Sequence, residues 1–103
     1  MFTSFNTKLA GVTFGDCQTN INKWGFDDIR FFYLKREPDN PHDPNAISVW
    51  FLDDRLGYLQ KTVSEKLAPA MDAGKKLTAK FMYRNEFGSD CIVGLTVKII
   101  EDD

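Results

Sequence analysis

The sequence has 103 residues, with 13 Lys and Arg against 15 Asp and Glu, so its formal net charge is −2. This length predicts one domain, and a hydrophobic content of 43% with nine Phe argues against a disordered or fibrous chain. No apolar run approaches the roughly 20 residues that a membrane-spanning helix needs. So small a net charge is not typical of a protein that coats nucleic acid through its overall field, but it leaves room for a site that contacts one or two phosphates.

The start of the chain and its two cysteines indicate the compartment. The first residues have neither a basic start nor an extended apolar stretch, so no secretory signal is expected. Cys17 and Cys91 form no C-x-x-C pair, and with a single histidine in the chain they complete no zinc site. We therefore predict a cytoplasmic protein with two independent thiols; a bridge between the two cysteines is the less favoured alternative.

The first part of the chain predicts a strand, a helix and a second strand. Thr7–Phe14 is the first strand. Cys17–Trp24 has apolar residues at spacings of four and three, which is typical of one helical face; Asp16 stands at the expected N-cap and Gly25 at the expected end. Asp28–Arg36 is rich in aromatic and branched residues and is predicted to be a strand buried on much of both faces.

The middle of the chain predicts a polar loop and a hairpin. The loop is Glu37–Asn45, and Ala46–Leu52 is the strand that follows it. Asp53–Arg55 is predicted to turn that strand into its antiparallel partner, Leu56–Gln60.

A second helix is predicted after the hairpin. Thr62 and Glu65 have the spacing of a capping box, in which each side chain bonds the backbone amide of the other residue. The helix is expected to end near Gly74. Pro69 lies inside it and lacks an amide hydrogen, so a kink, or a break into two short turns at Ala68, is expected.

The last part of the chain predicts two strands joined by the loop Asn85–Asp90. In Leu77–Arg84 the apolar side chains alternate with polar ones, which predicts one inward face. The inward residues are Leu77, Ala79, Phe81 and Tyr83. Cys91–Ile100 is the final strand, and Gly94 within it is expected to mark a bulge or a tight bend.

Six short strands and two helices, with strands mostly linked as hairpins, argue against a parallel doubly wound sheet. The predicted fold class is mainly β: a small six-stranded OB-like antiparallel β-barrel with two short helices. We expect residues 1–103 to form one domain, with a core at about 8–100 and an acidic C-terminal tail at 101–103.

Motifs for catalysis are missing from the sequence. It contains no G-x-S-x-G, H-E-x-x-H, G-x-G-x-x-G or Gly-rich phosphate loop. His42 is the one imidazole, and nothing in the spacing pairs it with a cysteine. The acidic segment Asp39–Asn45 lacks the alternating ligands and closing Glu of an EF-hand loop. We predict a protein that is not an enzyme, with no cofactor, no metal and no small-molecule substrate.

The most unusual segment is Arg36–Ala46, REPDNPHDPNA. Pro41 and Pro44 fix φ on either side of His42 and Asp43. Asp and Asn residues in this loop can bond neighbouring backbone amides as Asx turns. Residue types alone favour a rigid connection that satisfies its own backbone, with a binding site as the alternative.

Four segments in this order resemble a HIRAN domain, the module at the N-terminus of certain SWI/SNF-type DNA remodellers that also occurs as free-standing bacterial or phage proteins. The segments are Leu9–Asp16 (LAGVTFGD), Arg36–Ala46, Leu56–Leu59 (LGYL) and Leu67–Gly74 (LAPAMDAG). The pattern N-P-x-D-x-N-A followed by G-[YH]-[LI] at this separation is fairly specific. The resemblance implies an OB-like barrel that captures the 3′-hydroxyl end of single-stranded DNA in a repair or processing context.

The resemblance also implies a role for each residue of the site. Asp43 would accept a hydrogen bond from the terminal 3′-hydroxyl, with His42 and Asn40 beside it. Aromatic residues would stack on bases, and Tyr58 and Lys61 would contact phosphate. The implied DNA-binding residues are Phe14, Asn40, His42, Asp43, Tyr58, Lys61 and Phe87.

The sequence departs from the binding pattern and leaves alternatives open. Thr13 stands where the DNA-binding member has arginine, and His42 and Tyr58 also differ from that member. Phe14 at the end of an alternating strand is equally compatible with the core, and Lys61 with a solvated charge. The alternative function is a protein–protein interaction module on the same barrel with a degenerate DNA pocket, and an enzyme acting on DNA ends ranks third.

Overall fold

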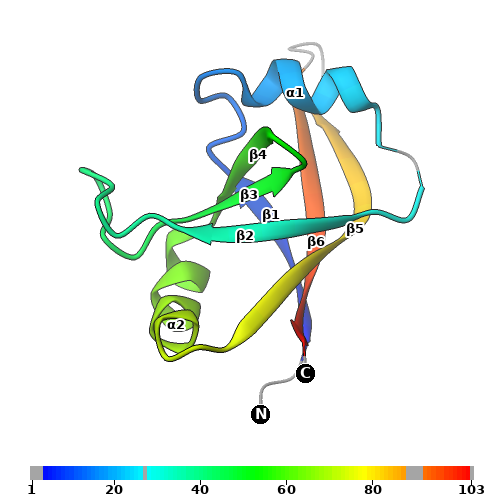
Figure 1. The fold of residues 1–103 in the computed structure, drawn as a ribbon. Coiled ribbons are helices and arrows are strands. Elements are labelled where there is room, and N and C mark those ends of the chain that lie inside the picture. Colours follow the sequence, from blue (N-terminus) through cyan, green and yellow to red (C-terminus); the bar gives the residue numbers. More distant parts are fainter. Residues whose placement is uncertain (1–3, 27, 88–91, 103) are drawn as a thin grey trace.

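The fold is a closed antiparallel barrel with two helices. The computed structural model describes residues 4–26, 28–87 and 92–102. The elements are β1 (Phe5–Ala10), α1 (Cys17–Trp24), β2 (Phe31–Arg36), β3 (Ile47–Phe51), β4 (Asp54–Leu59), α2 (Lys61–Asp72), β5 (Lys76–Phe87) and β6 (Ile92–Asp102). The strands close in the order β1-β4-β3-β2-β5-β6, and each neighbouring pair is antiparallel. The mainly β, OB-like six-stranded barrel is confirmed (Figure 1).

The core fills the inside of the barrel with branched and aromatic side chains. Val49, Leu95 and Ile99 are fully buried, in keeping with strands that turn alternate residues inward. Phe26 and Phe32 meet with ring centroids 5.0 Å apart near one end of the core. Figure 1 shows α1 lying across one end of the barrel and α2 beside the other. The helices therefore cover the openings of the barrel and leave much of its outer wall uncovered.

The outer wall corrects the prediction that the second strand is buried on both faces. Phe32 is 1% exposed, but Phe31 is 55% and Tyr33 49% exposed. The prediction was wrong because the aromatic density of the strand does not reveal whether an element covers its outer face. In the part of the chain that the structure describes, β2 is buried on its inner face only.

The first strand is shorter than predicted. It ends at Ala10, because Gly11 and Gly15 have φ of +62° and +49° and bend the chain before α1. Phe14 therefore lies in the bend with 61% of its surface exposed, which excludes the core alternative for this residue.

Helix α1 has the predicted bounds. Gly25 ends it in the left-handed conformation, and Cys17 is buried with a free thiol. Asp16 occupies the N-cap position but makes no side-chain cap bond. Cys91 lies outside the described residues.

The capping box predicted for the second helix is wrong. Helix α2 begins at Lys61, and the carbonyl of Gln60 accepts from the amides of Val63 and Ser64, both at 2.9 Å. Its N-cap makes no side-chain bond. Of the two outcomes expected at Pro69, the break at Ala68 is wrong, because one helix runs from Lys61 to Asp72; the kink stays a prediction.

The two C-terminal strands are longer than predicted. Residues expected in a loop belong to β5 as far as Phe87, and Glu101 and Asp102 extend β6 where a tail was expected. The bulge lies in β5 between Phe81 and Tyr83, so Tyr83 turns outward with 51% exposure, contrary to the predicted inward alternation. Gly94 pairs with Asn85 within the regular ladder.

Gly57 allows β1 and β4 to approach closely where the barrel closes. A Cβ at this buried position would lie 2.9 Å from the carbonyl oxygen of Ala10.

We expect Gly57→Ala to lower the free energy of unfolding by about 1–3 kcal/mol, because backbone has to move to admit the methyl group. Thermal and urea unfolding measure this. The control is Gly25→Ala, whose added Cβ has no atom within 4 Å. It should lower the free energy of unfolding only through its left-handed backbone conformation, by about 1–2 kcal/mol. A Gly57→Ala protein as stable as wild type would contradict the close approach.

Candidate functional site

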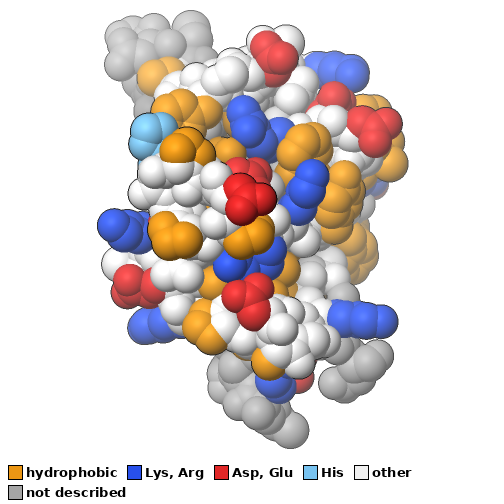
Figure 2. Space-filling view, turned by 60° about the vertical axis from the view of Figure 1, so that its left-hand side comes forward, with side chains coloured by type: hydrophobic (Ala, Val, Ile, Leu, Met, Phe, Trp, Pro, Cys, Tyr) orange, Lys and Arg blue, Asp and Glu red, His pale blue; other side chains and the backbone are white. Residues whose placement is uncertain are grey.

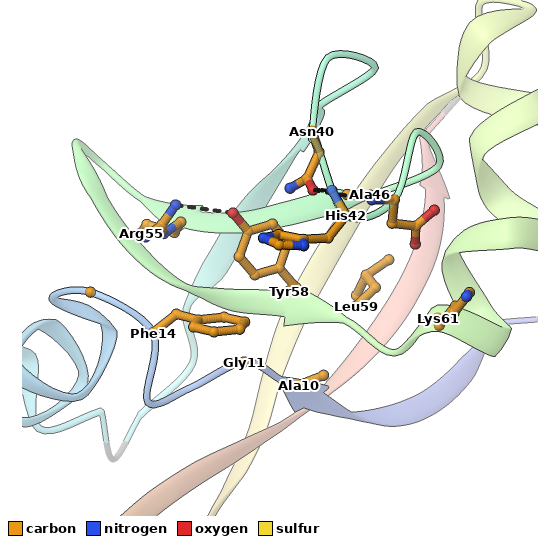
Figure 3. Close-up of a pocket in the computed structure, with 12 residues that line it drawn as sticks. Ala10, Gly11, Phe14, Asn40, His42, Ala46, Arg55, Tyr58, Leu59 and Lys61 are labelled. Carbon is orange, nitrogen blue, oxygen red and sulfur yellow. Dashed lines mark hydrogen bonds between the residues drawn. The ribbon is translucent and has the colours of Figure 1, made fainter.

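A cleft of about 440 Å³ opens where residues 11–15, the loop 37–45 and β4 meet. Six of the seven residues that the sequence singled out line it: Phe14, Asn40, His42, Asp43, Tyr58 and Lys61. Figure 3 shows Phe14, Tyr58 and His42 facing the same space, with Arg55 and Lys61 at its two ends. Figure 2 shows the histidine, in pale blue, at the surface beside hydrophobic side chains. Phe87 belongs to β5, and its side chain lies outside the described part of the structure.

The loop 37–45 is built from Asx turns. Oδ1 of Asn40 accepts from the backbone amides of His42 and Asp43 at 2.8 and 3.2 Å. Oδ1 of Asp43 accepts from the amide of Asn45 at 2.9 Å. The same bonds that satisfy the backbone also present His42 and Asp43 to the cleft. The rigid connection and the candidate site are therefore one structure, and a carboxylate has acceptor capacity for further donors.

The opposite wall of the cleft depends on a glycine bend. The amide of Phe14 donates to the carbonyl of Gly11 at 3.0 Å, which folds the ring back over the bend. A Cβ on Gly11 would lie 2.9 Å from Cδ2 of Phe14, so only glycine fits this bend without displacing the ring. Gln18 ties the bend to β6: its Nε2 donates to the carbonyls of Val12 and Val93 at 3.1 and 2.7 Å, and its Oε1 accepts from the amide of Val93 at 2.8 Å.

Tyr58 joins the two walls. Its ring meets Phe14 edge-on, with centroids 6.4 Å apart and an interplanar angle of 89°. Its hydroxyl accepts from Nη1 of Arg55 at 3.0 Å and donates to Oε1 of Glu37 at 3.1 Å. Nδ2 of Asn40 donates to the same Glu37 oxygen at 3.1 Å. A hydrogen-bonded chain thus runs from β4 to the loop beneath the cleft.

This chain shifts the pKa of its members. Burial acts to raise the pKa of Glu37, but hydrogen bonds from Ser48, Asn40 and Tyr58 and the charge of Arg55 outweigh it, so the pKa is lowered. Burial raises the pKa of Tyr58, against the opposing charge of Arg55. Glu37 is thus held as a carboxylate and Tyr58 as a neutral hydroxyl.

Arg55 is the site residue that sequence reasoning missed. The sequence predicted it in a turn, but the turn lies at Leu52 and Asp53, and Arg55 is in β4. Residues three apart on a regular strand point to opposite faces. Val49 pairs with Gly57 and Trp50 with Arg55, so β4 carries one extra residue between them. This bulge turns Arg55 to the side of Tyr58, where its guanidinium lies 5.4 Å from the ring centroid.

Two features are absent from the described residues: a group of metal-ligating side chains and a membrane-spanning helix. They contain no group of three or more His, Cys, Asp or Glu side chains placed to hold a metal ion. Neither described helix has the length and apolarity that a membrane span requires. The cleft instead offers aromatic faces, one carboxylate and two cations.

The family model of the HIRAN domain matches residues 3–99. The chain belongs to the HIRAN domain family. HIRAN domains are nucleic-acid-binding modules. The family resemblance inferred from the loop and the LGYL strand is confirmed.

Two solved structures share the fold of this HIRAN domain. A protein from Lactobacillus plantarum superposes with a TM-score of 0.74 at 22% identity, over 96% of this chain and 97% of that one. The HIRAN domain of human HLTF gives a TM-score of 0.67 at 20% identity, over 93% of this chain and 74% of that one. Comparison with curated proteins gives no match. At these identities the likeness shows the fold alone.

The lowered pKa of Glu37 predicts a pH dependence of stability. A carboxyl whose pKa is depressed by folding stabilises the protein above its ordinary pKa, and this contribution is lost as the pH falls through the folded value. We expect wild type to lose more stability than Glu37→Gln on acidification from about pH 7 to about pH 3, measured by thermal unfolding. The control Glu65→Gln, exposed on α2, should follow wild type. If the stability of wild type and of Glu37→Gln fell equally with pH, the stabilising role of the hydrogen bonds to Glu37 would be contradicted.

Proposed function

We propose that this HIRAN domain is a non-enzymatic module that binds the terminal nucleotides of single-stranded DNA and recognises the 3′-hydroxyl. The observation that carries the proposal is the convergence of Phe14, His42, Asp43 and two cations on one cleft, from segments far apart in the sequence. A module of this kind fits a role in DNA repair or processing.

Asp43 gives the proposed site its preference for an end. A carboxylate accepts well from a hydroxyl and repels a phosphate. A strand that continues beyond the sugar, or ends in a phosphate, brings negative charge to this carboxylate. Asp43 therefore discriminates a free 3′-hydroxyl from both.

The aromatic residues and cations supply affinity without reading sequence. Phe14 is 61% exposed and offers a face for base stacking, which contributes about 1–3 kcal/mol per base. Lys61 and Arg55 line opposite ends of the cleft (Figure 3), and each would pair there with a phosphate. Thr13 lacks the charge that the DNA-binding pattern has at this position, and Arg55 supplies a guanidinium from β4 instead.

Asp43→Asn tests the end recognition. Asn keeps the Oδ1 acceptor that holds the amide of Asn45, so the loop should fold as before. Wild type should bind a short oligonucleotide with a 3′-hydroxyl about tenfold or more tighter than one with a 3′-phosphate, and Asp43→Asn should lose most of this ratio. Fluorescence anisotropy measures both affinities, with Asp39→Asn in the same loop as control. Equal wild-type affinity for the two ends contradicts the proposal; capture of a specific protein instead would favour the interaction module.

Arg55→Gln tests the cation at the other end of the cleft. We expect weaker binding of 3′-hydroxyl and 3′-phosphate strands alike, because Arg55 contacts phosphate and not the terminus. The slope of log affinity against log salt should fall in magnitude by about 0.7, the value for one phosphate contact on a single strand. Arg55→Lys should restore the slope, and Arg84→Gln, on β5, should leave it unchanged. An unaltered slope in Arg55→Gln would remove the phosphate role.

A further inference from the structure

The outer wall of the barrel carries exposed aromatic side chains next to lysines. Cross-strand pairing places the side chains of Phe31 with Lys80, Tyr33 with Trp50, and Lys80 with Lys98 on this wall. The rings of Tyr33 and Trp50 stack, with centroids 6.4 Å apart and an interplanar angle of 13°. We name this surface the aromatic–lysine face: Phe31, Tyr33, Lys35, Trp50, Lys80 and Lys98.

The charges of the aromatic–lysine face are all positive. Lys80 and Lys98 stand directly opposite each other on β5 and β6, an arrangement that costs stability in the absence of an anion. Lys35 lies over the ring of Trp50, with Nζ 5.4 Å from the centroid. Within residues 4–26, 28–87 and 92–102, none of these three lysines forms an ion pair with a carboxylate. The surface therefore complements a polyanion that also carries flat apolar groups.

The aromatic–lysine face is continuous with the cleft. A second, more open depression is lined by Lys35 and shares Asn40 and Tyr58 with the cleft. Glu37 and Asp39 also line this depression. Oε1 of Glu37 accepts from both Asn40 and Tyr58, so the negative charge of this carboxylate is partly stabilised by hydrogen bonds within the protein.

We propose that a single strand of nucleic acid whose terminus lies in the cleft continues over the aromatic–lysine face, where bases stack on Tyr33, Trp50 and Phe31 and phosphates meet the lysines. Aromatic faces lined by cations are the surface that single strands require. A protein partner that covered this wall with apolar side chains would bury Lys80 and Lys98 without a counter-charge, which costs binding free energy. The inference rests on the proposed function, because the cleft fixes where the strand ends.

Strand length separates this surface from the cleft. The probes are a thymidine trinucleotide and a twelve-residue oligothymidylate, both with a 3′-hydroxyl. Wild type should bind the longer strand at least about fivefold more tightly, the gain from stacking one further base. Tyr33→Thr and Lys80→Gln should each remove much of this gain while binding the trinucleotide as wild type does. Lys66→Gln, an exposed lysine on α2, is the matched control and should change neither affinity.

Stability distinguishes a binding lysine from a structural one. Lys80→Gln removes the repulsion with Lys98, so its melting temperature should equal or exceed that of wild type. This variant therefore remains informative even if Tyr33→Thr, which loses the hydrogen bond from its hydroxyl to the carbonyl of Leu52, folds poorly. Lower stability of Lys80→Gln together with unchanged binding of the long strand would overturn the inference.

A 3′-phosphate on the longer strand separates the two proposals. If Asp43→Asn loses the preference for the 3′-hydroxyl but keeps the length gain, both surfaces act as proposed. If wild type shows no end preference but Lys80→Gln still weakens binding of the long strand, the aromatic–lysine face stands and the cleft proposal falls. If Tyr33→Thr and Lys80→Gln bind the twelve-residue strand like wild type, the face is not a nucleic-acid surface.

Discussion

The hydroxyl of Tyr58 connects the parts from which the cleft is made. It accepts from Arg55 and donates to Glu37, while its ring contacts Phe14. This residue therefore contacts both the bend that carries Phe14 and, through Glu37, the loop that carries Asp43. The preceding glycine allows β1 to lie against β4 at the same point. The segment Leu56–Leu59 (LGYL) thus has two roles: Gly57 lets β1 and β4 pack closely, and Tyr58 and Leu59 line the candidate cleft.

The sequence predicts the cleft well where local chemistry decides the backbone. Proline and Asx residues within the loop bond the backbone around His42 and Asp43 locally. The position of Arg55 could not be predicted in this way. The face of β4 on which Arg55 lies depends on one extra residue in that strand. Such a bulge is a property of two paired strands, so the sequence of one strand does not reveal it. The turn ends two residues earlier than predicted and a bulge follows it, and together these two differences concealed Arg55 as a residue of the cleft.

The position of Phe14 and the exposure of β2 show a second limit of sequence reasoning. A strand dense in aromatics predicts burial, and an alternating strand that ends in Phe is as compatible with burial as with exposure, because aromatic side chains are most often buried. Two glycines with positive φ remove Phe14 from its strand. The helices cover the ends of the barrel and leave Phe31 and Tyr33 exposed. In both cases the exposed rings lie near cations, the arrangement to which the two proposals assign contact with bases.

A net charge of −2 is compatible with binding a polyanion because distribution matters more than the sum. At physiological ionic strength exposed charges are largely screened beyond about 8 Å. Several acids lie in ion pairs away from the cleft, such as Asp72 with Arg36 and Glu101 with Lys75. Among the described residues, the lysines of the aromatic–lysine face lie in no ion pair, and Arg55 lines the cleft while it donates to Tyr58. The proposed strand would therefore meet a few local cations rather than a positive overall field, with Glu37 and Asp39 lining the depression between the two surfaces.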